Sequence, residues 1–146
     1  MARDFIERLE QRCAVSNVEL PRAATGALAN YFELLMKWNA RINLTSLRLS
    51  PVADEALDRL FVEPLAAIPY VPSASVRWFD LGSGGGSPAL PLKIAWGQGA
   101  LTMVEVKARK AAFLREVLRT LNLHGASVEH GRIEEAARVH RGSAHL

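Results

Sequence analysis

Apolar residues recur every three or four positions through the first part of the chain. This spacing predicts an amphipathic helix over residues 3–15 and a second helix from Pro21 to about Arg41. Proline suits the first turn of the second helix, because the N–H group that it lacks would be unpaired there in any case. We therefore expect residues 1–72 to form a small helical segment.

A third helix is expected after a short polar break. Ser50 would be its N-cap residue and Pro51 its first helical residue. Pro64 lies inside the projected helix and should kink or end it, because a proline ring clashes with the preceding turn.

From residue 76 onward the pattern changes, and short β-rich runs alternate with helical repeats. Strands are expected at 76–81, 101–106 and 126–129, helices at 88–95 and 107–123, and a weak helix from residue 133. This alternation is typical of parallel βαβ units. The predicted fold class is therefore α/β, with a parallel sheet in a domain over residues 73–146.

Composition narrows the class of protein without naming a function. The single cysteine, Cys13, excludes an internal disulfide and a multi-cysteine metal site, and we expect no metal. The chain begins with no basic and apolar leader, and no apolar run approaches about 18 residues, so a soluble, cytoplasmic protein is expected. From Val76 onward ten basic residues face six acidic ones. That excess suits a phosphate-rich partner, and it equally suits a solvated surface.

A glycine-rich run follows the first expected strand and opens the next helix. Its spacing, D-x-G-x-G-x-G, departs from a dinucleotide fingerprint because Ser87 stands where the third glycine would fall. Glycines let a ligand approach the main chain. Glu105 ends the next expected strand, where a carboxylate can accept both ribose hydroxyls of an adenine nucleoside. A glycine-rich turn with no ligand remains the alternative.

Four motifs in order resemble those of the bacterial 16S ribosomal RNA methyltransferase G family, also called glucose-inhibited division protein B. Residues 38–45 resemble its W-N-x-x-x-N-L-T signature, and residues 79–92 its D-x-G-[ST]-G-x-G-x-P-G-x-P-L loop. Residues 105–114 resemble its acidic strand end and K-x-x-F-L helix, and residues 132–134 its R-x-E. The resemblance implies a Rossmann-like class I methyltransferase fold.

The resemblance also implies a cofactor, a reaction and a set of site residues. Members use S-adenosylmethionine to methylate N7 of a guanosine in small-subunit ribosomal RNA. The cofactor residues so implied are Asp80, Gly82, Ser83, Gly84, Gly86, Pro88, Glu105, Ile133 and Glu134. The implied substrate residues are Asn43, Thr45 and Lys110, although Asn43 and Thr45 suit a helix-capping role equally well. No catalytic base is named, since guanine N7 carries a free lone pair.

Other side chains leave two interpretations open. Trp38 completes a helical stripe, so we interpret it as core rather than as a platform for a nucleobase. Five basic residues of one expected helix either contact RNA phosphates or form its solvated face: Lys107, Arg109, Lys110, Arg115 and Arg119. For Arg115 and Arg119 the solvated face is favoured. The four histidines lack the spacing of metal ligands and are assigned no role.

The sequence departs from the family pattern in three places. Ala89 replaces a glycine, and residues 59–64 lack the family's His and Ser. Only three strands of a seven-stranded sheet are visible, so we expect a truncated Rossmann-like half-domain with a frayed tail over residues 140–146. The first strand would then have an unpaired edge, and the isolated chain would be unstable or self-associate, with little activity. The alternatives are another methyl acceptor, or a catalytically silent domain that binds cofactor or RNA.

Overall fold

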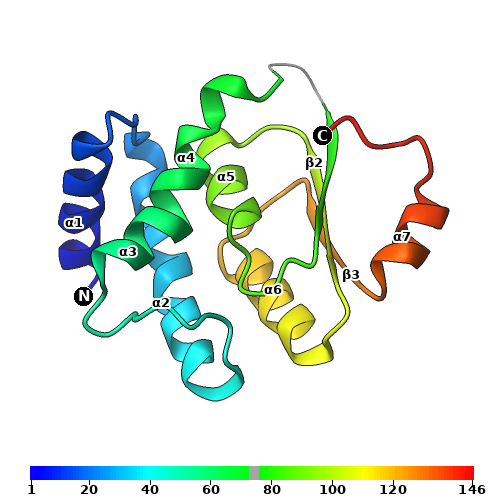
Figure 1. Cartoon of the computed structure of the whole chain (residues 1–146), viewed down its shortest axis with the longest axis horizontal. Helices are drawn as coiled ribbons and strands as arrows, with labels where there is room; N and C mark the ends of the chain where they lie inside the picture. Colours follow the sequence, from blue (N-terminus) through cyan, green and yellow to red (C-terminus); the bar gives the residue numbers. More distant parts are fainter. Residues whose placement is uncertain (73–75) are drawn as a thin grey trace.

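The structure is a computed structural model that describes residues 1–72 and 76–146 (Figure 1). The N-terminal elements are α1 (Ala2–Val15), η1 (Arg22–Ala24), α2 (Thr25–Ile42), α3 (Asp54–Leu57), the π-helical turn η2 (Asp58–Val62), α4 (Glu63–Ala66) and η3 (Ile68–Tyr70). The following elements are β1 (Arg77–Leu81), α5 (Ala89–Trp96), β2 (Ala100–Glu105), α6 (Ala108–Thr120), β3 (Ala126–His130) and α7 (Ile133–Val139). The predicted alternation of strands and helices is confirmed.

Aromatic rings hold the N-terminal helices together. Phe5 of α1 stacks on Phe32 of α2 at 4.5 Å between ring centroids, and its edge meets Phe61 of η2 at 5.0 Å. Cys13 is buried on the same face of α1, where burial raises the pKa of its thiol to about 11. The thiol therefore stays neutral, and Cys13 behaves as a small buried apolar residue.

The third helix begins later than the sequence predicts. Ser50 and Pro51 form a turn, and α3 starts only at Asp54, with Ala53 as its N-cap residue. The side chains on either side of the turn, Leu49 and Val52, are buried and their backbones form an antiparallel bridge. Burial of the Leu49 and Val52 side chains stabilises this reverse turn at the place where the sequence predicts the start of a helix.

The helix also continues past Pro64 instead of ending there. The π-helical turn η2 directly precedes α4, in which Pro64 is buried near the start. Proline has no amide hydrogen to donate to the carbonyl group four residues earlier, which is that of Leu60. The Leu60 carbonyl accepts a hydrogen bond from the Ser87 hydroxyl at 2.9 Å.

The three strands form a parallel sheet in the order β1-β2-β3. Figure 1 shows α5 and α6 between the sheet and the N-terminal helices, with α7 on the opposite face. One apolar cluster includes Leu35 of α2, Leu90 of α5 and Phe113 of α6, so the helical segment packs directly against the α/β part.

The other edge of β1 is partly covered by the C-terminal residues. The His145 amide donates to the Arg77 carbonyl at 2.7 Å, and the Phe79 amide donates to the Leu146 carbonyl at 3.2 Å. His140 packs against the Phe79 ring at 5.0 Å. The expected frayed tail is therefore wrong, and so is the expected unpaired edge at Arg77 and Phe79. Backbone N–H and C=O groups that stay unpaired beside apolar surface cost free energy. Hydrogen bonds between the C-terminal residues and β1 are therefore favoured over a free tail. Self-association stays a prediction.

Candidate functional site

The glycine-rich loop joins β1 to α5 at the edge where the parallel strands end. The amides of Gly82 and Ser83 both donate to the Val104 carbonyl of β2, at 2.8 and 3.2 Å. Gly86 has a φ of +92°, and a Cβ atom there would lie 2.3 Å from Cδ1 of Leu90. Because the Leu90 side chain is fully buried, only glycine fits this position.

Asp80 is the penultimate residue of β1, and one of its carboxylate oxygens is unsatisfied. Its Oδ2 atom is buried, and it finds no hydrogen-bond partner among the described residues. Burial raises the pKa of Asp80 above its ordinary value. A buried acceptor without a donor is costly to keep, so Asp80 is a candidate for contact with a cationic or hydrogen-bond-donating ligand.

Glu105 ends β2 and is buried, with 5% of its surface exposed. Its Oε1 atom accepts the Gly84 amide and its Oε2 atom accepts the Lys107 amide, each at 2.9 Å. These two bonds tie the glycine-rich loop to the end of β2. An ionised carboxylate has about four acceptor positions. Glu105 therefore keeps acceptor capacity for a ligand while it holds the loop.

The remaining predicted cofactor residues lie at the same edge. Ser83 is buried, and its hydroxyl donates to the Asp80 carbonyl at 3.1 Å, while Pro88 precedes α5. The Gly131 amide donates to the Glu105 carbonyl at 3.0 Å, so the chain leaving β3 passes beside the end of β2. Ile133 and Glu134 follow there at the exposed start of α7.

Two further residues position the loop, and the sequence analysis did not assign them this role. The Tyr31 hydroxyl of α2 donates to the Gly85 carbonyl at 2.6 Å, and Tyr31 is completely buried. The Ser87 hydroxyl bonds the Leu60 carbonyl described above. In the sequence Tyr31 looks like one more member of an apolar helical stripe, so its role could not be inferred. The role of Ser87 could have been inferred from Pro64, because a proline leaves a helix carbonyl without its usual donor.

The predicted substrate residues lie near one another at the end of α2 and the start of α6. Asn43 is the C-cap residue of α2 in a left-handed conformation, with φ of +53°. The Thr45 amide donates a hydrogen bond to Oδ1 of Asn39 at 2.8 Å, and the Thr45 hydroxyl accepts the Leu47 amide. Both residues order the loop that follows α2. Asn43 also lines a groove together with Lys110.

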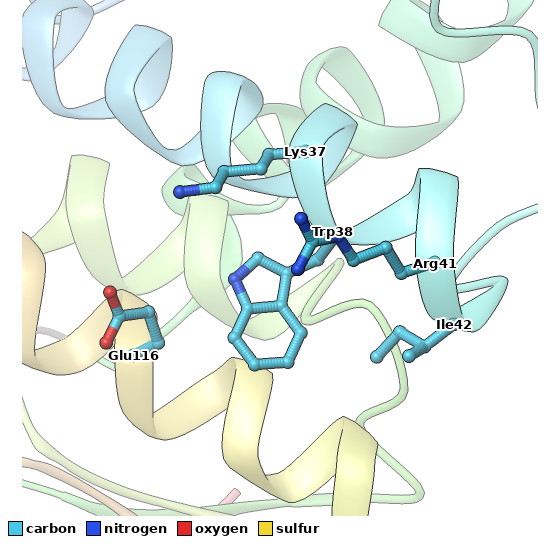
Figure 2. A pocket seen from close by; sticks show the side chains of 5 residues that line it. All are labelled: Lys37, Trp38, Arg41, Ile42 and Glu116. Atoms are coloured by element: carbon cyan, nitrogen blue, oxygen red, sulfur yellow. The ribbon is translucent and has the colours of Figure 1, made fainter.

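Trp38 packs between α2 and α6. Its ring lies 5.7 Å from that of Phe113, and it is half-buried. Figure 2 shows the ring projecting from α2 toward α6, in a hollow of about 220 Å³ that Glu116 lines from the other side. The contact with Phe113 favours the interpretation of Trp38 as a packing residue.

Within residues 1–72 and 76–146, no cluster of three or more His, Cys, Asp or Glu side chains is arranged to hold a metal ion. The described helices include none that is long and apolar enough to cross a membrane.

Comparison with known proteins agrees with this geometry. A family model for rRNA small subunit methyltransferase G matches residues 24–145. The chain is 36% identical over 129 residues to the ribosomal RNA small subunit methyltransferase G of Pseudomonas entomophila, covering 88% of this chain and 58% of the relative. The protein of the same name from Desulfotalea psychrophila is 33% identical over 135 residues, covering 92% of this chain and 61% of the relative.

A similar protein from Pseudomonas aeruginosa is 39% identical over 107 residues, which is 73% of this chain and 48% of the relative. The chain thus spans roughly half to three-fifths of the length of these relatives. The family match includes the glycine-rich loop, both acidic strand ends and the helices that hold the loop. The chain belongs to the rRNA small subunit methyltransferase G family.

Proposed function

We propose that this chain forms the cofactor-binding part of an S-adenosylmethionine-dependent methyltransferase that acts on small-subunit ribosomal RNA. The observation that carries the proposal is the buried, unpartnered Oδ2 atom of Asp80, beside a glycine-rich loop that Glu105 holds in place. The names of the relatives support the reaction and the RNA substrate.

The residues at the strand ends fit the parts of S-adenosylmethionine. Asp80 offers a carboxylate oxygen to the ammonium group of the methionine part, an ionic hydrogen bond that would satisfy its buried acceptor. Glu105 offers its remaining acceptor positions to the ribose hydroxyls. We assign the adenine to the exposed start of α7, with Ile133 and Glu134, as the resemblance implies. Gly82, Gly84 and Gly86 let the ligand approach the main chain.

The cofactor supplies a methyl group that is already activated on a sulfonium centre. We infer that the acceptor is N7 of a guanine in the RNA, as the resemblance implies. The chain's residues then have to place the nucleotide in line with the donor, and no proton needs to be removed from N7. Asn43, Thr45 and Lys110 are the residues that we assign to the acceptor side.

The test is calorimetric binding of S-adenosylmethionine and its demethylated product to the chain and to two variants. Asp80→Asn and Glu105→Gln should each weaken binding by about 1.5–3 kcal/mol, the scale of hydrogen bonds to charged groups. Asp4→Asn, at an exposed position of α1, is the control and should bind normally. Unchanged affinity in both site variants would refute the assignment.

Thermal unfolding distinguishes a lost ligand contact from a lost fold. Asp80→Asn removes a buried carboxylate, so the free variant should melt at a higher temperature even though it binds cofactor less well. A variant that melts at a lower temperature would show instead that Asp80 supports the fold. The expected low activity of the isolated chain stays a prediction, measured by methyl transfer to small-subunit ribosomal RNA.

A further inference from the structure

A groove of about 660 Å³ lies between the end of α2 and the start of α6. Its lining residues are Arg41, Ile42, Asn43, Lys107, Ala108, Arg109 and Lys110. Four of these seven are basic and, within the part of the chain that the structure describes, none is acidic. The volume is in the range of about 300–1,000 Å³ that is usual for ligand sites.

The basic side chains of the groove are uncompensated. Among the described residues, neither Arg41 nor the three basic residues over 107–110 forms an ion pair. Other arginines differ, since Arg12 pairs with Asp58 at 2.7 Å and Arg119 pairs with Glu116 at 2.8 Å. Four cations gathered around one concave surface repel one another, and an anionic ligand would relieve that repulsion.

The groove opens beside the proposed cofactor site. The Lys107 amide donates to Oε2 of Glu105, the carboxylate that we assign to the ribose. The backbone amides of Lys107 and Gly84 partly compensate the negative charge of Glu105. The first turn of α6, which begins at Ala108, adds the positive end of its helix dipole to the same side.

The smaller hollow around Trp38 is a poorer site for an anion. It shares Arg41 and Ile42 with the groove, but Glu116 lines its opposite wall, as Figure 2 shows. A carboxylate there would repel a phosphate group. Lys37 and Arg41 offset Glu116 in the smaller hollow, whereas four basic residues face no acidic one in the groove, so of the two the groove is the better site for an anion.

We propose that the groove binds the phosphate backbone of the RNA substrate next to the nucleotide that receives the methyl group. This inference rests on the proposed function, because it takes the RNA to be the substrate of the adjoining site. Arg41 from α2 and Arg109 from α6 face the groove from its two walls, so each contributes a separate phosphate contact. Such contacts set register and orientation and carry no sequence information.

The test measures the binding of a fluorescent single-stranded RNA of about 12 nucleotides, a length that one such surface can track. The chain is compared with the double variant Arg41→Gln/Arg109→Gln across a series of salt concentrations. The control, Arg22→Gln/Arg115→Gln, removes the same charge at two exposed positions that have no ion pair in the described structure and do not line the groove.

Loss of two phosphate contacts should lower the slope of log affinity against log salt by about 1.4, since each contact with single-stranded RNA contributes about 0.7. The control should keep the slope of the unchanged chain. Equal slopes for the two double variants would overturn the proposal. So would equally tight binding of an acidic peptide of the same charge, which would show that the groove accepts any polyanion.

Binding of S-adenosylmethionine is measured on the same samples. The groove variant should bind the cofactor as the unchanged chain does, because neither Arg41 nor Arg109 contacts Asp80, Glu105 or the loop in the described hydrogen bonds. If the cofactor fails to bind but the groove variant loses RNA binding, the groove is confirmed and the cofactor assignment fails. If the cofactor binds but RNA binding is unaffected, the groove alone is refuted.

Discussion

Replacing Tyr31 with phenylalanine tests whether the N-terminal helices position the glycine-rich loop. The substitution removes one hydroxyl group and keeps the ring, so the packing of Tyr31 against Phe61 at 5.7 Å is preserved. The hydroxyl donates to the Gly85 carbonyl at 2.6 Å. Burial raises the pKa of Tyr31 above its ordinary value, so the hydroxyl keeps the proton that it donates.

The expected loss follows from what the variant leaves behind. Tyr31 is completely buried and Gly85 is half-buried, so the Gly85 carbonyl loses its donor at a position that water reaches only in part. Leaving a buried acceptor unsatisfied costs about 1–3 kcal/mol. At about 3 °C per kcal/mol for a chain of this size, the melting temperature should fall by about 3–9 °C.

Thermal unfolding followed by circular dichroism gives this number. Tyr70→Phe is the matched control, because Tyr70 is 88% exposed and its hydroxyl forms no hydrogen bond among the described residues. Its melting temperature should change by less than about 2 °C, as is usual for surface substitutions. If Tyr31→Phe melts at the same temperature as Tyr70→Phe, the hydroxyl does not hold the loop and the reasoning is refuted.

Two further predictions concern the loop and the sheet edge. Gly86→Ala should lower the free energy of unfolding by about 1–3 kcal/mol, because the new Cβ would meet Leu90 and the φ of Gly86 is +92°. The control, Gly26→Ala, adds its Cβ to open space on α2 and should raise the free energy of unfolding by about 0.5–1 kcal/mol. Chemical denaturation measures both, and equal effects would contradict the loop geometry. Deleting His145 and Leu146 frees the β1 edge, so light scattering should detect more self-association than in the unchanged chain. An unchanged molar mass would show that the uncovered edge of β1 does not pair with another chain.

The α/β part was predictable because its signals are local. A strand that ends in Asp80, a glycine-rich turn and a following helix lie within one short stretch of sequence. Glu105 could be placed opposite that turn because parallel strands end at a common edge. The sequence therefore placed both carboxylates at one site, although it did not reveal that Glu105 also binds the amides of Gly84 and Lys107.

The features that the sequence did not reveal depend on distant partners. The tail was expected to fray because residues 140–146 do not resemble the family pattern, yet the amide of His145 and the carbonyl of Leu146 bond β1 across more than 60 positions of sequence. Helix α3 starts at Asp54 rather than after Ser50, because the burial of Leu49 and Val52 favours a turn over a helix capped by Ser50. Local propensity is a weak guide when tertiary packing decides.

The helical segment does more than cover one side of the sheet. The glycine-rich loop is held by Val104 and Glu105 from β2, by Tyr31 from α2 and by the Leu60 carbonyl through Ser87. A loop held only at Glu105 could rotate about that contact, and it would lose conformational entropy when a ligand fixed it. With two anchors in the helical segment, much of that ordering is complete before a ligand arrives, which favours tighter binding. The sequence shows this link only at Pro64, whose missing amide hydrogen leaves a helix carbonyl available to the loop.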